Sequence, residues 1–320
     1  MIVRLTRQVL LYSLLFLWQV AAGQPAEWVV APDGTGDFTC IQEAINAVPD
    51  FRQQRTVIRI TPGVYKEKLI LPASKTNISF IGDDAATTVI TYDDYASRKN
   101  AFGENIGTSG SSSFFVFGDG FHAENITFEN SAGRVGQAVA VRVAATHVSF
   151  YGCRFLGHQD TLYPQEAGTK QYYRNCYIEG TTDFIFGAAT AVFEECTIFS
   201  KKGASYITAA STPDTSAFGF VFLRCELRGD ADDESVYLGR PWRPYAKTAF
   251  IECDYGEIIC PEGWNNWGRE SNEHTASYVE YGNTGRSADT VNRVNWSQTL
   301  TPAERDKFTL DGIFGDWNLE

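Results

Sequence analysis

Three segments of the sequence share one short pattern and decide the fold: Tyr151-Gly152-Cys153-Arg154-Phe155, Arg174-Asn175-Cys176-Tyr177-Ile178 and Glu194-Glu195-Cys196-Thr197-Ile198. In each, apolar or cysteine residues alternate with polar ones, as in a short strand with one buried face. Related segments occur at 76–80, 124–128, 224–227 and 252–255, and the cysteines of the series lie 23, 20, 29 and 28 residues apart. One strand pattern per unit of about 20–30 residues indicates a solenoid.

The pattern favours an all-β solenoid over the alternatives. Helical repeats need amphipathic stretches of period 3.6, and these are missing through the middle of the chain. A β-sandwich would need hairpin turns such as Asn-Gly, and the sequence contains no Asn-Gly pair. We therefore expect a right-handed parallel β-helix whose coils stack about 4.8 Å apart.

Two helices are expected at the ends of the solenoid. Near the N-terminus, Thr39 and Gln42 form a candidate capping box before an apolar stripe that Pro49 ends; the stripe comprises Ile41, Ala44, Ile45 and Val48. This helix would cover the open first coil. Thr301-Pro302-Ala303-Glu304 reads as a second helix start. Without a linker-like stretch, residues 24–320 are expected to form one domain.

Residues 1–23 resemble a secretory signal peptide. Arg4 and Arg7 precede an apolar run over 9–18, and small residues follow it at 21–23. The alternative, a membrane anchor, is disfavoured because the run is too short to cross about 30 Å of hydrocarbon. The sequence therefore predicts a secreted, extracellular protein.

The charge balance limits the partners. The 320 residues include 27 Lys plus Arg and 39 Asp plus Glu, a formal net charge of −12. Nucleic acid and anionic membranes are disfavoured because both are recognised through basic residues. Seven cysteines leave at least one thiol free, and the lack of a C-x-x-C pair argues against a zinc site. Glycosylation sequons stand at Asn77, Asn125 and Asn295.

Two aspartates follow the repeat. Asp160 and Asp183 each lie seven residues after a pattern cysteine and are 23 residues apart, so they should stack on adjacent coils. Gln137 lies 23 residues before Asp160, and Gln159 is its neighbour. A close acid pair holds one group as the anion and the other as the acid, which suits nucleophilic and acid–base catalysis. The alternative is a structural acid pair satisfied by Arg or Ca²⁺.

At these residues the chain resembles the pectin methylesterase (pectinesterase) family. Five motifs occur in the family's order, over a resemblance that runs from about Val30 to Trp296: Gly63-Val64-Tyr65-Lys66-Glu67, Gln137-Ala138-Val139-Ala140, Gln159-Asp160-Thr161-Leu162, Asp183-Phe184-Ile185-Phe186-Gly187 and Leu238-Gly239-Arg240-Pro241-Trp242. The resemblance implies a parallel β-helix that removes methyl groups from methyl-esterified homogalacturonan (pectin), giving pectate and methanol.

The resemblance also implies a role for each motif residue. Asp183 would be the nucleophile and Asp160 the general acid/base, with Gln137 and Gln159 stabilising the oxyanion and Arg240 orienting Asp183. The substrate-binding residues it implies are Thr108, Gln137, Phe184, Arg240 and Trp242. His158 reads as a loop residue, and Tyr65 as a core aromatic. No cofactor is implied, and a monomer is expected.

The cysteines are assigned through the resemblance alone. Cys176 and Cys196 occupy the places where the family often has a disulfide. Cys253 with Cys260 would close a small additional loop, and Cys153 and Cys225 are expected to point inward and stay reduced.

Three other functions stay open. A pectin hydrolase or lyase on the same fold would lower polymer viscosity. A catalytically inactive carbohydrate-binding solenoid would lack a catalytic residue, and an esterase or thioesterase of this fold could act on another acyl group. The acidic surface should repel pectate, which predicts weak processivity and scattered demethylation.

Overall fold

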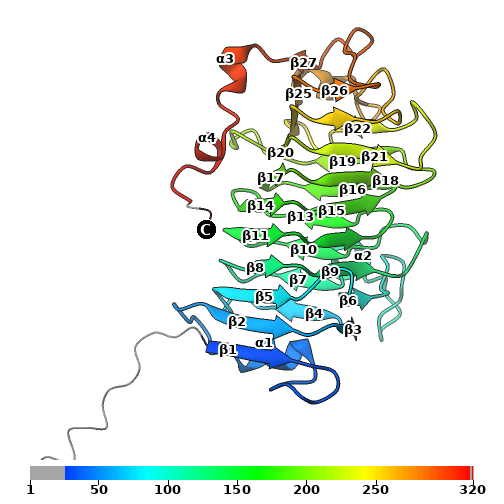
Figure 1. The fold of residues 1–320 in the computed structure, drawn as a ribbon. Helices are drawn as coiled ribbons and strands as arrows, with labels where there is room; N and C mark the ends of the chain where they lie inside the picture. The colour runs from blue at the N-terminus through cyan, green and yellow to red at the C-terminus, as the bar shows by residue number, and fades with distance from the viewer. Residues whose placement is uncertain (1–25, 318, 320) are drawn as a thin grey trace, which may run out of the picture.

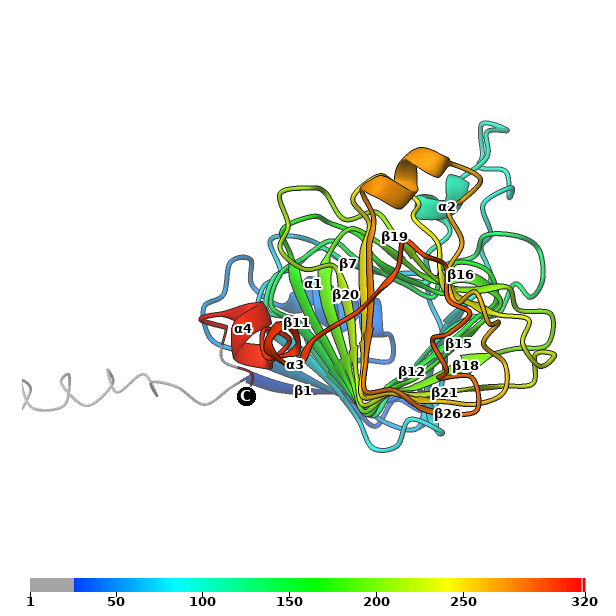
Figure 2. The same ribbon diagram turned by 90° about the horizontal axis from the view of Figure 1, so that it is seen from above.

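The computed structural model describes residues 26–317 and 319, so the predicted signal peptide at 1–23 lies outside the described residues. The described chain winds into a parallel β-helix whose coils contribute strands to three sheets (Figures 1 and 2). Every strand pairing between the named strands is parallel, which confirms the predicted fold.

The first sheet, sheet A, has eleven strands: β1 (Ala26–Val30), β2 (Thr56–Ile60), β5 (Ile78–Gly82), β8 (His122–Glu124), β11 (Val148–Tyr151), β14 (Lys170–Arg174), β17 (Thr190–Glu194), β20 (Phe220–Leu223), β23 (Lys247–Ile251), β25 (Ser277–Tyr281) and β27 (Gln298–Thr299). Sheet B has nine: β3 (Gly63–Lys66), β6 (Thr88–Tyr92), β9 (Thr127–Asn130), β12 (Arg154–Leu156), β15 (Tyr177–Gly180), β18 (Thr197–Ser200), β21 (Glu226–Gly229), β24 (Asp254–Tyr255) and β26 (Thr284–Gly285). Sheet C has seven: β4 (Leu69–Leu71), β7 (Phe114–Val116), β10 (Val141–Val143), β13 (Leu162–Pro164), β16 (Thr182–Gly187), β19 (Tyr206–Ala210) and β22 (Tyr237–Gly239).

Stacked aromatic rings fill the inside of sheet A. Residues in register on successive strands have ring centroids 4.3–5.1 Å apart, close to the strand spacing; they are Phe150, Tyr173, Phe193, Phe222 and Phe250. All five rings are fully buried. The repeat in the sequence is therefore the repeat of this core.

A single residue in the left-handed conformation makes each of five successive corners between sheets A and B, from the corner between β11 and β12 to the corner between β23 and β24. These residues, with φ between 51° and 59°, are Gly152, Asn175, Glu195, Arg224 and Glu252. The cysteine that follows each of these corners points into the core, so Cys153 and Cys225 are buried as predicted.

The predicted disulfides are wrong for this structure, in which all seven cysteines are free. The Sγ atom of Cys176 donates to the Phe150 carbonyl at 3.4 Å, and that of Cys196 to the Tyr173 carbonyl at 3.5 Å. Cysteines at equivalent places on stacked coils project in parallel, whereas a disulfide requires their Cβ atoms to converge. Cys253 likewise donates to the Phe222 and Ile251 carbonyls and makes no bond to Cys260.

The expected helix covers the first coil. Helix α1 (Ile41–Ala47) buries Ile41, Ala44 and Ile45, as the stripe predicted, and it packs against β1 and β4. The predicted capping box is wrong: Cys40 is the N-cap residue and makes no side-chain cap. Instead the Glu67 carboxylate accepts hydrogen bonds from the backbone N–H groups of Ile41 and Gln42, at 2.9 and 3.0 Å.

The C-terminal helices lie outside sheet A (Figure 2). Helix α3 (Pro302–Arg305) begins at the predicted helix start, where Thr301 and Glu304 form a capping box. Helix α4 (Leu310–Phe314) buries Ile313 and Phe314 on an apolar stripe of outward-facing sheet A residues, which includes Val192, Val221, Leu223, Ala249 and Ile251. Two short helices, α2 (Gly107–Gly110) and the 3-10 helix η1 (Glu270–His274), lie outside sheet C.

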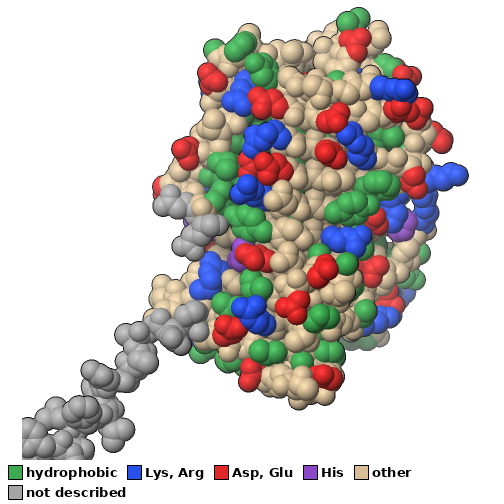
Figure 3. Space-filling view, in the orientation of Figure 1, with side chains coloured by type: hydrophobic (Ala, Val, Ile, Leu, Met, Phe, Trp, Pro, Cys, Tyr) green, Lys and Arg blue, Asp and Glu red, His purple; other side chains and the backbone are tan. Residues whose placement is uncertain are grey.

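Acidic and basic side chains are interspersed on the face shown in Figure 3. Many form ion pairs across neighbouring coils, such as Arg224 with Glu194 and Arg228 with Asp254. None of the helices that the structure describes is long and apolar enough to cross a bilayer.

Candidate active site

A cleft of about 500 Å³ lies on the outer face of sheet C. Strands β13, β16 and β19 form its floor, and α2 and the loop around Trp267 border it. Nearly all the predicted site residues meet here, and the lining residues are Ile106, Gly107, Thr108, Ser109, Gln137, Gln159, Asp160, Tyr163, Asp183, Phe186, Ala209, Arg240, Trp242 and Trp267.

The two glutamines stack one coil apart, on a step of 22 residues rather than the 23 that would place Gln137 opposite Asp160. Gln137 and Gln159 form a parallel bridge, and the residue after Gln137 donates its N–H to the Gln159 carbonyl at 3.1 Å. Their side chains line the cleft beside Asp160. Two amide groups therefore border the same space as the acid pair.

The acid pair also lies on adjacent coils. Leu162 pairs with Ile185, which sets the predicted 23-residue register, and the Asp160 N–H donates to the Thr182 carbonyl at 3.1 Å. Asp160 and Asp183 are 8% and 6% exposed, and both adopt the left-handed conformation, with φ of 66° and 51°. The corner residues Asn175, Glu195, Arg224 and Glu252 share this conformation, so it belongs to the tight turns of the coils.

A β-bulge sets the direction of the side chains around Asp183. Thr182 pairs with Tyr206 but Ile185 pairs with Thr208, so β16 has one residue more than β19 in this interval. Phe184 and Ile185 consequently both point into the core, where each is fully buried. The prediction that Phe184 contacts substrate is therefore wrong, and Phe186 reaches the cleft instead.

Arg240 holds the Asp183 carboxylate in a two-point ion pair. Its Nε lies 2.8 Å from one carboxylate oxygen and a terminal nitrogen lies 2.6 Å from the other. The guanidinium carbon is 3.8 Å from the ring centroids of both Tyr206 and Trp267, so the group is held between two aromatic rings. This planar clamp fixes the orientation of Asp183.

Burial raises the pKa values of both carboxyl groups, but the neighbouring charges act on them differently. Burial raises the pKa of Asp160 well above its usual range, the charge of Asp183 raises it further, and Arg240 opposes the rise. Burial also raises the pKa of Asp183, while the Arg240 hydrogen bonds and charge lower it. Asp183 therefore ionises first, and its charge keeps Asp160 protonated.

Aromatic rings form the remaining walls. Tyr163 and Phe186 stack with centroids 4.1 Å apart, and Trp242 lies 6.4 and 6.0 Å from them. Thr108 borders the cleft from α2. The arrangement offers flat apolar faces to a ring-shaped ligand above a buried acid pair.

A family model for pectinesterases matches residues 27–316. The chain belongs to the pectinesterase family. Among curated pectinesterases, Pectinesterase 31 of Arabidopsis thaliana is 42% identical over 87% of this chain and 89% of that protein. The pectin methylesterase from carrot superposes with a TM-score of 0.83 at 34% identity, covering 92% of this chain and 94% of that chain. A pectin methylesterase in complex with hexasaccharide VII gives 0.81 at 26% identity, covering 92% and 99%. This pectinesterase is accordingly a carboxylic ester hydrolase.

Sequence reasoning missed several residues of the pectinesterase cleft. Tyr163 and Phe186 are 23 residues apart, the same step as the two aspartates, so the repeat could have identified them. Tyr206 also lies one 23-residue step after Asp183, whereas Trp267 carries no such signal, because a long loop brings it to Arg240. His158 stays outside the cleft lining, and Tyr65 is a buried core residue, as predicted.

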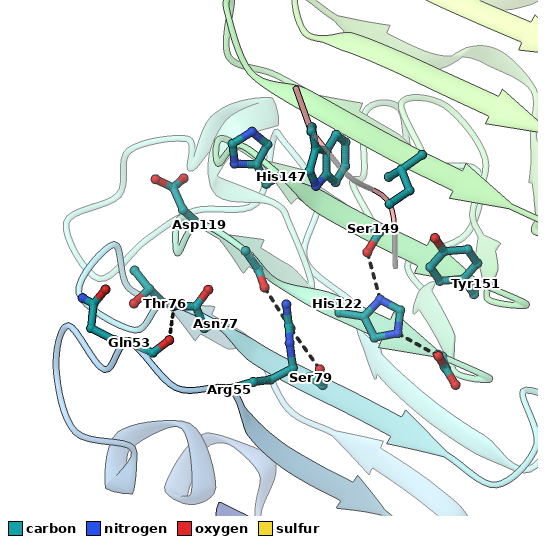
Figure 4. A pocket seen from close by; sticks show the side chains of 14 residues that line it. Gln53, Arg55, Thr76, Asn77, Ser79, Asp119, His122, His147, Ser149 and Tyr151 are labelled. Carbon is teal, nitrogen blue, oxygen red and sulfur yellow. Dashed lines mark hydrogen bonds and ion pairs between the residues drawn. The ribbon is translucent and has the colours of Figure 1, made fainter. Parts of the chain in front are cut away.

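A larger hollow of about 840 Å³ lies on the outside of sheet A, away from the pectinesterase cleft (Figure 4). There His122 hydrogen-bonds Ser149 and Glu124, at 2.8 Å each. These residues occupy neighbouring positions of a polar ladder on β8 and β11. We assign the reaction to the smaller cleft, because it contains the buried acid pair and the aromatic walls.

Proposed function

We propose that this chain, secreted and acting outside the cell as a monomer, demethylates methyl-esterified homogalacturonan. The relatives named above are pectinesterases and pectin methylesterases. The observation that carries the proposal is the ion pair between Arg240 and Asp183 beside the buried Asp160, whose pKa burial raises. The sorting signal expected at 1–23 supports export.

In the first step, the Asp183 carboxylate attacks the C6 carbonyl of a methylated galacturonate. A bond forms between the Asp183 oxygen and C6, and negative charge develops on the carbonyl oxygen. The side-chain amides of Gln137 and Gln159 donate to this oxyanion. As the tetrahedral intermediate collapses, Asp160 gives its proton to the departing methoxy oxygen and methanol leaves.

In the second step, water hydrolyses the resulting anhydride. The Asp160 carboxylate removes a proton from the water, whose oxygen attacks C6. The bond between Asp183 and C6 breaks, which restores the Asp183 carboxylate and the protonated Asp160. Arg240 holds Asp183 in the attacking orientation, and Trp242 with Thr108 binds the sugar chain. Carboxylate, amide and guanidinium groups supply all of this chemistry.

Methanol release from highly esterified pectin tests the proposal. We expect Asp183→Ala to lower kcat at least about 10⁴-fold, because it removes the nucleophile. Asp233→Ala, an exposed aspartate outside the cleft, should match the wild type. Unchanged circular dichroism controls for folding. Methanol release by Asp183→Ala at the wild-type rate would refute the assignment, and an early fall in viscosity would favour a depolymerase.

A further inference from the structure

A row of outward-facing side chains runs along the axis of the solenoid through the cleft. The members lie in register on successive strands of sheet C; they are Ile70, Phe115, Arg142, Tyr163, Phe186 and Ala209. Five of the six are uncharged. Arg142, on β10, is the exception and lies one coil from Tyr163 and two from Phe186.

The guanidinium of Arg142 has neutral surroundings. Its Nε donates to the Gln165 side-chain oxygen, and a terminal nitrogen lies 3.4 Å from the Ser109 carbonyl. It stacks over Phe115 and Phe117, with centroids at 6.0 and 5.4 Å. Within residues 26–317, no carboxylate lies close enough to form an ion pair with Arg142, unlike the paired arginines on the outer faces.

Arg142 lies close enough to the acid pair to contact a sugar next to the reacting ester. Coils are stacked at about 4.8 Å, so the guanidinium stands roughly 5–10 Å along the axis from the acid pair. Ser109 and Tyr163, which border the cleft, also border Arg142. The length of one sugar residue in a 1,4-linked pyranose chain is comparable with the spacing between two stacked coils. A polymer lying along the row would therefore bring a neighbouring sugar over Arg142.

We infer that Arg142 binds the free carboxylate of a galacturonate one or two residues from the reacting ester. The inference rests on the proposed function. A planar guanidinium matches a carboxylate through two parallel hydrogen bonds, and a methyl ester offers neither the charge nor the second strong acceptor. Arg142 thus discriminates between the product and substrate forms of the neighbouring sugar.

The consequence is a preference for esters beside an already demethylated residue. Each turnover creates one carboxylate, which makes the next ester along the chain a better substrate. Runs of free acid then form even when the enzyme leaves the polymer after every turnover. The net charge alone predicts scattered demethylation, whereas binding at Arg142 predicts runs of demethylated residues.

The test compares kcat/KM on fully esterified pectin with that on randomly half-demethylated pectin. For Arg142→Gln, the ratio of the second to the first should fall about tenfold or more, the effect of losing a charge-assisted hydrogen bond. Arg142→Lys should recover part of the ratio, because it keeps the charge but not the fork. Arg154→Gln is the matched control: Arg154 also stacks on an aromatic ring, Tyr177, but on sheet B.

Two results would overturn the inference. One is an equal fall of Arg142→Gln on both substrates, which would indicate a structural role. The other is a ratio of the two kcat/KM values that is the same for Arg142→Gln as for Arg154→Gln. Failure of the proposed function would differ from both, because the wild type would then release no methanol from either pectin.

Discussion

Asp160 and Asp183 have the same side chain, but their surroundings act differently on their ionisation. Both are buried, which disfavours ionisation. Arg240 bonds directly to Asp183, whereas Asp160 faces the Asp183 charge. The ion pair therefore decides which acid attacks and which donates the proton.

This division predicts how Asp160→Asn changes activity with pH. Activity of the wild type should fall on the acid side as Asp183 gains a proton, and on the alkaline side as Asp160 loses one. Burial raises the pKa of both groups, so both the acid and the alkaline limb of the pH–activity profile lie above the ordinary pKa of aspartate. Asp160→Asn should lose about 10²–10⁴-fold in kcat and its remaining activity should lack the alkaline limb. A retained alkaline limb would show that another group donates the proton.

The same variant should be more stable than the wild type at alkaline pH. Because the folded pKa of Asp160 lies above the unfolded value, its favourable contribution is complete at low pH and is lost as pH rises through the folded pKa. Asparagine has no proton to lose. Urea unfolding should give Asp160→Asn an advantage of at least about 1 kcal/mol near pH 8 that vanishes near pH 3. An advantage that does not vary with pH would contradict this account.

At the scale of elements, the sequence repeat predicted what the stacking of coils requires. The parallel stacking of coils, the inward cysteines and the register of Asp160 with Asp183 all follow from the spacing of short strand patterns. It could not predict departures from that regularity. The bulge in β16 buries Phe184, and Glu67 caps α1 from the loop between β3 and β4, because both depend on which chain segments meet in space.

The end of β16 shows how tightly the site's backbone is constrained. Gly187 has φ of 141°, and a Cβ there would lie 2.0 Å from the Pro164 carbonyl oxygen. We expect Gly187→Ala to lower the free energy of unfolding by more than about 3 kcal/mol, since strain and overlap add. Gly168→Ala, at φ of 79° in open space, should cost about 1–2 kcal/mol. Equal urea midpoints for the two variants would show that β16 relaxes around the methyl group.

For the whole molecule, charge acts at two ranges. The net charge of −12 repels a polyanion over a distance set by the Debye length, about 8 Å at physiological salt. Arg142 acts on one carboxylate at contact distance, where salt screens less. Repulsion therefore shortens each encounter with the polymer, while the cleft selects which ester reacts. Weak retention and neighbour preference are compatible properties of one enzyme.

A chase experiment separates these two properties. The enzyme first acts on pectin with deuterated methyl esters, and a large excess of unlabelled pectin is then added. Because repulsion releases the enzyme between turnovers, the deuterated share of new methanol should fall at once to the share found when both pectins are mixed beforehand. The labelled polymer, recovered and analysed by NMR, should still contain more adjacent acid pairs than random removal gives. Continued deuterated methanol over many turnovers would instead show that the runs arise from processive movement, and that the acidic surface does not govern release.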